Sequence, residues 1–215
     1  MKKSILSLTV SMLCLFIQFS NAQALSAKKQ KLPVYAEVGL GWGQALFFGD
    51  MRAQLIRSYG GAFDPGIGNN LMMGFYAAPE KWKGLGLGSR IRGTFGSSVE
   101  GDNGDNYIFN YYNLAISAKY YAFSREFNKG LYLRGSLGFG QFTTKRQNEA
   151  TNLYKHQYAI GSSLMGGIGY TIQLKKTALS FEVEFEYSSR GGTIDGIGNA
   201  TYQSGQIGAN VIISF

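Results

Sequence analysis

The 215-residue sequence predicts an all-β protein, an eight-stranded antiparallel up-and-down transmembrane β-barrel. Three observations support this fold class. Bulky apolar residues alternate with small or polar ones along most of the chain, and the connections between candidate strands alternate between long and short. In addition, the charged residues within strands share the parity of glycine and serine, opposite to that of the large apolar side chains.

The predicted barrel covers residues 34–215, and the preceding residues have a different character. Lys2 and Lys3 are followed by an uncharged, mostly apolar run over 5–19 and by small residues at the positions that a signal peptidase recognises. We interpret 1–22 as a cleaved signal peptide and 23–33 as a polar N-terminal lead. A retained membrane anchor is the alternative, but the run is shorter than the roughly 18 residues that a spanning helix needs. The only cysteine, Cys14, lies in this run, so no disulfide is expected in the mature chain.

Eight segments of the remaining chain have strand character, and none shows a convincing helical period. They cover residues 34–48, 70–78, 85–97, 107–122, 131–143, 157–173, 178–189 and 205–215.

The connections between these strands alternate in length. Those predicted to be long or polar are 49–69, 98–106, 144–156 and 190–204, whereas the short ones are 79–84, 123–130 and 174–177. Outer-membrane barrels combine short turns on one side with long loops on the other. A soluble barrel or a two-sheet sandwich is the alternative, but neither has a reason to segregate connection lengths by face. The connection 49–69 is the longest candidate contact surface, although we expect an ordinary exposed loop there.

The segment LSFEVEFEYSS, residues 179–189, raises the question of which strand face is inside. Its aromatic and aliphatic residues share a parity with bulky residues of the other strands, and together they exceed the interior of an eight-stranded barrel. The opposite parity is rich in glycine and serine, which leaves room for charged side chains. We therefore expect the bulky face to point outward and the charged face inward.

Four acidic and four basic residues occupy the predicted interior, and they are expected to pair because unpaired buried charges are prohibitively unstable. The predicted lumen network consists of Glu37, Arg90, Arg92, Lys119, Arg134, Glu182, Glu184 and Glu186. An ion or proton path is one interpretation. We favour a network that fills and orders the barrel, because the interior has little spare cross-section.

Aromatic residues fall near both ends of the predicted strands, as two interfacial girdles would require. Tyr112, Phe139, Tyr158 and Tyr187 lie toward the loops, and Tyr120, Tyr170 and Phe215 lie toward the turns. A general preference of aromatic residues for strands is the alternative explanation.

The final strand, GQIGANVIISF, resembles the C-terminal assembly signal of bacterial outer-membrane barrels, with a glycine, spaced hydrophobic residues and a terminal aromatic. The resemblance implies that the barrel-assembly machinery reads Gly208, Val211, Ile213 and Phe215. The layout of the mature chain is similar to the membrane domain of the OmpA family and to OmpW-like barrels, and FFGDM at Phe47–Met51 resembles barrels of Bacteroidetes. We expect no peptidoglycan-binding domain of the kind that full-length OmpA-type proteins carry.

Catalytic chemistry is not expected from the residues. Some barrels of this size modify lipid A with a histidine and a serine, but His156 is the only histidine, and the His-x-Ser arrangement is missing. We predict no metal centre and no cofactor; Asp102 and Asp105 could hold calcium, but an Asp/Asn/Gly stretch is more often a turn.

The resemblance implies an integral protein of the bacterial outer membrane, with the lead 23–33 in the periplasm. The net charge of +8 includes no long basic run, so we expect an anionic surface rather than nucleic acid as partner. Outer-membrane lipid and lipopolysaccharide are the expected partners, and the expected role is structural or surface-binding. A narrow channel or lateral passage for small or apolar solutes is the alternative, and a lipid A-modifying enzyme is less favoured.

Overall fold

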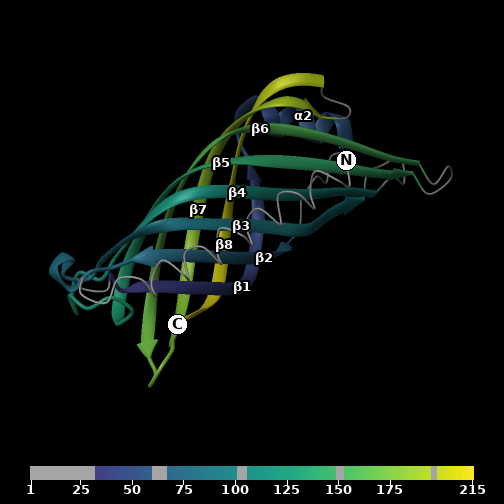
Figure 1. Cartoon of the computed structure of the whole chain (residues 1–215). Helices are drawn as coiled ribbons and strands as arrows, with labels where there is room; N and C mark the ends of the chain where they lie inside the picture. Colours follow the sequence, from purple (N-terminus) through teal and green to yellow (C-terminus); the bar gives the residue numbers. More distant parts are fainter. Residues whose placement is uncertain (1–31, 60–66, 101–105, 149–152, 195–197) are drawn as a thin grey trace, which may run out of the picture. The chain divides into compact units, whose positions relative to one another are not determined.

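Each strand of the protein pairs with the next strand along the chain, and the last pairs with the first, so the sheet closes into an antiparallel barrel (Figure 1). The computed structural model describes residues 32–59, 67–100, 106–148, 153–194 and 198–215. The predicted signal peptide 1–22 and all of the lead 23–33 except its last two residues lie outside the described residues. The prediction of an eight-stranded antiparallel barrel is confirmed.

The elements of the barrel follow one another without a crossover. They are β1 (Val34–Phe47), α2 (Gly49–Tyr59), β2 (Ile67–Ala77), the 3-10 helix η1 (Glu80–Trp82), β3 (Leu85–Glu100), β4 (Asn106–Tyr120), β5 (Gly130–Asn148), β6 (Leu153–Gln173), β7 (Ala178–Ile194) and β8 (Gly198–Ser214).

The seam between β1 and β8 closes the barrel along eleven residue pairs, from Glu37 opposite Ser214 to Phe47 opposite Ser204. The last residue continues the ladder, because the Phe215 amide donates to the Ala36 carbonyl at 3.0 Å and the Ala36 amide donates to the Phe215 carbonyl at 2.9 Å. A closed sheet has no free edge, so each of these strands has a partner for its backbone on both sides.

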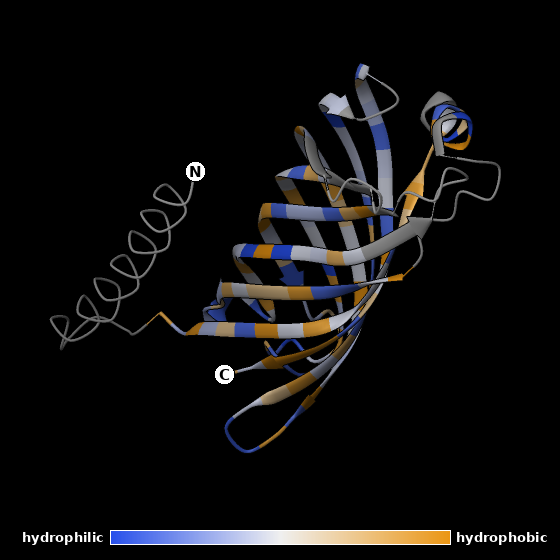
Figure 2. Cartoon of the chain, turned by 90° about the vertical axis from the view of Figure 1, so that its right-hand side faces the viewer, coloured by the Kyte–Doolittle hydropathy of each residue, from blue (hydrophilic) through white to orange (hydrophobic). Residues whose placement is uncertain are grey.

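Alternate residues of each strand face opposite sides of the sheet. The bulky apolar residues face outward, where Leu137 is 60% and Ile116 is 67% exposed. Figure 2 shows the resulting alternation of hydrophobic and hydrophilic positions along the strands. Glycine, serine and charged residues face inward, so the predicted parity of the two faces agrees with the structure.

Two of the four connections that we predicted to be long, 144–156 and 190–204, consist largely of strand, and this part of the prediction was wrong. β5 continues to Asn148 and β6 begins at Leu153, while β7 continues to Ile194 and β8 begins at Gly198. β3 and β4 likewise extend into the predicted connection 98–106. The apolar period fades in these segments, but backbone pairing does not depend on it, and paired strands continue as long as their neighbours continue.

The predicted loop 49–69 contains a helix, α2, which the sequence analysis missed. Its buried side chain, Leu55, belongs to an apolar cluster with Phe47, Phe109, Phe142 and Tyr202 inside the barrel. Met51, Leu55 and Tyr59 lie four residues apart in this sequence, but so few apolar positions in eleven residues make a helical period too weak to predict the helix. No helix in the described segments is long and apolar enough to cross a membrane.

A β-bulge interrupts the pairing of β3 with β4 between Thr94 and Ser97. Gly96 has a φ of +79° there, which is a conformation that favours glycine, and its amide donates to the Asn110 side chain at 3.1 Å. The bulge shifts the register by which the outer part of β3 pairs with β4.

Replacing Leu55 by Asp should release α2 from the barrel, because a charge would replace a fully buried side chain. We expect trypsin to cleave at the exposed Arg52 and Arg57 about tenfold faster or more, since loss of a buried leucine costs about 2–3 kcal/mol. Ala53→Asp places the same charge at an exposed position of the helix and is the control. Equal cleavage rates in the two variants would show that Leu55 does not anchor the helix.

Candidate functional site

The charged side chains of the barrel wall meet in its interior. All eight residues of the predicted network are buried, and a ninth, Arg190, is fully buried as well. They come from β1, β3, β4, β5 and β7, and each lies at an inward position of its strand. Ion pairs connect these side chains into two groups, one around Glu37 and Glu182 and one around Glu184 and Glu186.

Glu37 organises the group nearer to the turn-side ends of the strands. Lys119 Nζ lies 2.5 Å from one carboxylate oxygen of Glu37, and Arg134 Nη2 lies 2.8 Å from the other. Arg134 also reaches Glu182, with its Nε 3.1 Å from Oε2, and the Tyr132 hydroxyl donates to that oxygen at 2.8 Å. Two carboxylates and two cations therefore neutralise one another across β1, β4, β5 and β7.

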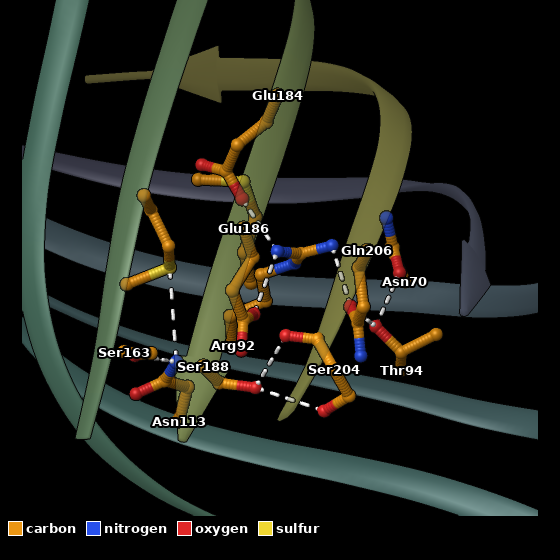
Figure 3. A network of polar contacts seen from close by, with 12 residues as sticks. Asn70, Arg92, Thr94, Asn113, Ser163, Glu184, Glu186, Ser188, Ser204 and Gln206 are labelled. Carbon is orange, nitrogen blue, oxygen red and sulfur yellow. Dashed lines mark hydrogen bonds and ion pairs between the residues drawn. The ribbon is translucent and has the colours of Figure 1, made fainter. Parts of the chain in front are cut away.

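Glu184 and Glu186 organise the second group. Glu184 pairs with Arg90 and Arg92, and Arg92 Nη1 lies 2.6 Å from its Oε1. The same Arg92 nitrogen is 3.3 Å from Glu186, so one guanidinium links two carboxylates that are neighbours on the inner face of β7 (Figure 3). The other end of Arg92 donates to Gln206 Oε1 at 2.8 Å, which ties β3 to β8.

Arg190 extends this group toward the loops, and the sequence analysis missed it. Its guanidinium lies 2.6 Å from Glu186 and 2.7 Å from the Ser188 hydroxyl, and 5.3 Å from the ring centroid of Tyr111. We had ended the strand at Ser189, although Arg190 continues the parity of the three glutamates. With Arg190 included, the buried set contains five cations and four carboxylates.

Uncharged polar residues complete the interior between β2, β3 and β8. The Asn70 amide donates to Asn210 at 3.1 Å, and the Thr94 hydroxyl lies 2.6 Å from Asn70 Oδ1 and 2.8 Å from Gln206 Oε1. Figure 3 shows Asn70, Thr94 and Gln206 gathered on one side of Arg92. These residues occupy the inward-facing alternate positions of their strands, as the charged residues do, and that pattern in the sequence could have identified them as part of the interior network.

Gly208 lies against this network, which explains the residue at that position independently of any assembly signal. A Cβ atom there would lie 2.7 Å from Asn70 Nδ2 and 3.3 Å from Arg92 Nη2, so a side chain would displace the polar groups. The other residues of the predicted assembly signal, Val211, Ile213 and Phe215, are exposed on the outer face. Their recognition by assembly machinery remains a prediction.

Aromatic and apolar side chains pack at both ends of the charged region. On the turn side, Lys119 Nζ lies 4.2 Å from the ring centroid of Tyr132, and Tyr121 packs against both Tyr132 and Phe127. On the loop side, Phe109 stacks on Phe142 with ring centroids 5.6 Å apart, within the cluster that includes Leu55. Along the barrel axis, the charged region therefore lies between an apolar layer on the loop side and an aromatic layer on the turn side.

The candidate catalytic and metal-binding residues are not brought together in the described part of the chain. We expected His156 in a connection, but its backbone lies in β6, opposite Lys145 of β5. Asp102 and Asp105, the possible calcium ligands, lie outside the described residues. Among the residues that the structure describes, no group of three His, Cys, Asp or Glu side chains could hold a metal ion.

Glu184→Ala should lower the free energy of unfolding by about 3–5 kcal/mol, because it leaves Arg90 and Arg92 buried without this carboxylate. Urea titration of the purified folded protein, followed by tryptophan fluorescence, measures the change. Glu126→Ala removes a carboxylate from the exposed pair with Lys129 and should change stability by about 0.5 kcal/mol or less. Equal losses in the two variants would contradict a stabilising role of the buried network.

Comparisons with known proteins support the fold. No protein-family model and no curated protein matches the sequence. A crystal structure of Ail, the attachment invasion locus protein of Yersinia pestis, in complex with the heparin analogue sucrose octasulfate, is similar with a TM-score of 0.55 and 15% identity over 85% of this chain and 99% of that chain. A second Ail crystal structure has a TM-score of 0.53 and 15% identity over 84% of this chain and 98% of that chain. The chain has the fold of the small eight-stranded outer-membrane β-barrels.

Proposed function

We propose that this protein is an integral β-barrel of the bacterial outer membrane with a non-enzymatic role, either stabilising the membrane or presenting its loop-side surface for binding. The observation that carries the proposal is the arrangement of side chains around the barrel wall. Large apolar residues are exposed on the outer face of all eight strands, while charged residues are buried inside. Soluble monomers rarely expose apolar patches above a few hundred Å², so the outer face requires an apolar surrounding.

The spacing of the exposed aromatic residues fits a bilayer. On β6, Tyr158 and Tyr170 are both exposed on the outer face and bracket Ile160, Leu164 and Ile168. Twelve residues of strand tilted by about 40° rise roughly 30 Å along the barrel axis, close to the thickness of a hydrocarbon core. The two tyrosines are therefore suitably placed for the two membrane interfaces.

A filled interior supports a structural role over a channel. The loop-side apolar cluster, the paired charges and the turn-side aromatic layer occupy successive levels of the barrel. An ion crossing this interior would have to separate buried pairs that exclude water, which is unfavourable. The same filling opposes the alternative of an axial path for small solutes.

Biogenesis follows from the same proposal. Residues 1–22 would direct export and be removed, and the barrel-assembly machinery would read Gly208, Val211, Ile213 and Phe215. In the outer membrane the apolar wall would contact lipid, and the loop-side end would face lipopolysaccharide.

Electrophoresis without boiling tests the membrane barrel directly. The mature protein should require detergent or lipid to remain soluble, and its folded form should migrate differently from the boiled form because a closed barrel resists SDS. A monomeric, folded protein in buffer without detergent or lipid would contradict the proposal.

Planar-bilayer recording distinguishes the structural role from the channel. We expect the wild-type protein to insert without steady conductance. Reproducible unitary currents from heat-modifiable protein would support the channel instead and leave the membrane barrel intact.

A further inference from the structure

An open groove lies on the outer wall of the barrel at its turn-side end. It has a volume of about 740 Å³ and is bordered by the connection between β4 and β5 and by the facing ends of β5 and β6. The residues that matter for its chemistry are Phe123, Ser124, Lys129, Leu131, Tyr170 and Ile172. Figure 1 shows the connections β2–β3, β4–β5 and β6–β7 at the same end of the barrel.

The wall of the groove is apolar and continuous with the outer face of the barrel. Leu131 and Tyr170 are paired residues of β5 and β6, and Ile172 is the next outward residue of β6. Phe123 extends from the β4–β5 connection and is 80% exposed, an unusual state for a phenylalanine. An acyl chain could lie against this wall and cover the ring.

The turn-side connections are strongly basic. Six exposed cations stand against two exposed carboxylates, Glu80 and Glu126. The cations are Lys81, Lys83, Arg125, Lys129, Lys175 and Lys176.

One cation borders the groove, and two more lie close to it along the chain. Lys129 lies on its border with about half of its side chain exposed, and it pairs with Glu126 at 2.9 Å. Lys175 and Lys176 follow closely after Gln173, which also lines the groove. Lys129 therefore places positive charge at the border of the groove, and two further lysines lie within three residues of its lining.

We propose that this groove binds an anionic phospholipid of the leaflet at the turn-side end. One acyl chain lies along Leu131, Tyr170 and Ile172 beneath Phe123, and the phosphate group is held by Lys129 and the lysines of the β6–β7 connection. The inference rests on the proposed membrane location, and it adds a ligand of defined chemistry that the barrel fold alone does not require.

Charge and position favour a lipid over an acidic protein as the occupant. Each lysine near an anionic membrane surface contributes to binding, and the groove opens on the wall that would already contact acyl chains. A protein partner would have to reach this wall through the bilayer.

Native mass spectrometry of the folded, detergent-solubilised protein tests the proposal with phosphatidylglycerol and phosphatidylcholine of identical acyl chains. Wild-type protein should retain phosphatidylglycerol preferentially. The double variant Lys129→Gln/Lys175→Gln should weaken phosphatidylglycerol binding about tenfold and weaken phosphatidylcholine binding much less, because the choline group already neutralises the phosphate of that lipid. The variant Arg52→Gln/Arg57→Gln removes the same charge from exposed positions of α2 and should bind as the wild type does.

Phe123→Ser tests the apolar part of the groove and should weaken both lipids to a similar extent. The groove assignment would be overturned if wild-type protein retained the two lipids equally. It would also be overturned if the lysine double variant and the arginine double variant lost phosphatidylglycerol binding to the same extent. Electrophoresis of each preparation without boiling distinguishes failure of the groove assignment from failure of the proposed function. The heat-modifiable form is lost only if the protein is not a closed membrane barrel.

Discussion

Closing an eight-stranded sheet on itself leaves an interior that only side chains fill, and this constraint determines how the nine buried charged residues of the described wall are arranged. A charge inside such a barrel is cut off from water, so it is tolerated only when another charge neutralises it. Glu37, Glu182, Glu184 and Glu186 each contact at least one buried cation. Glycines beside them supply the volume that these long side chains occupy, and the bulky apolar residues are left for the outer face.

The same constraint makes the two ends of the barrel different. Toward the loops, α2 inserts Leu55 into an aromatic cluster, so the interior ends in an apolar layer. Toward the turns, Tyr121 and Tyr132 pack around Lys119, and exposed lysines of the short connections surround the outside. Side chains packed at both levels of the interior are consistent with a structural protein, and exposed lysines at the turn-side end of an apolar wall are suited to a charged lipid surface.

Period-two alternation, the alternating connection lengths and the parity shared by charged and small residues together predicted the strand number, the closed antiparallel order and the inward face of the charged residues. The network partners could be assigned to one interior but not to one another, since pairing depends on the tilt and register of the strands. Arg190 and His156 were assigned to connections because polar residues weaken the apolar period, although the strands continue through both positions. Leu55 shows a different limit: α2 is short, and its few apolar positions give a helical period too weak to distinguish it from a loop.

The central claim is that the outer wall faces lipid, and nitroxide labels on its strands measure this most directly. In the mature chain expected without residues 1–22, which contain the only cysteine, single cysteines at Leu133, Leu137 and Leu164 can be labelled after reconstitution in vesicles, with Arg57 of α2 as the exposed reference. Collision with oxygen, which concentrates in the bilayer, should exceed collision with a water-soluble nickel complex at the three leucine positions, and the reverse should hold at Arg57. Greater access of the nickel complex at the leucine positions would contradict the inverted arrangement of the barrel.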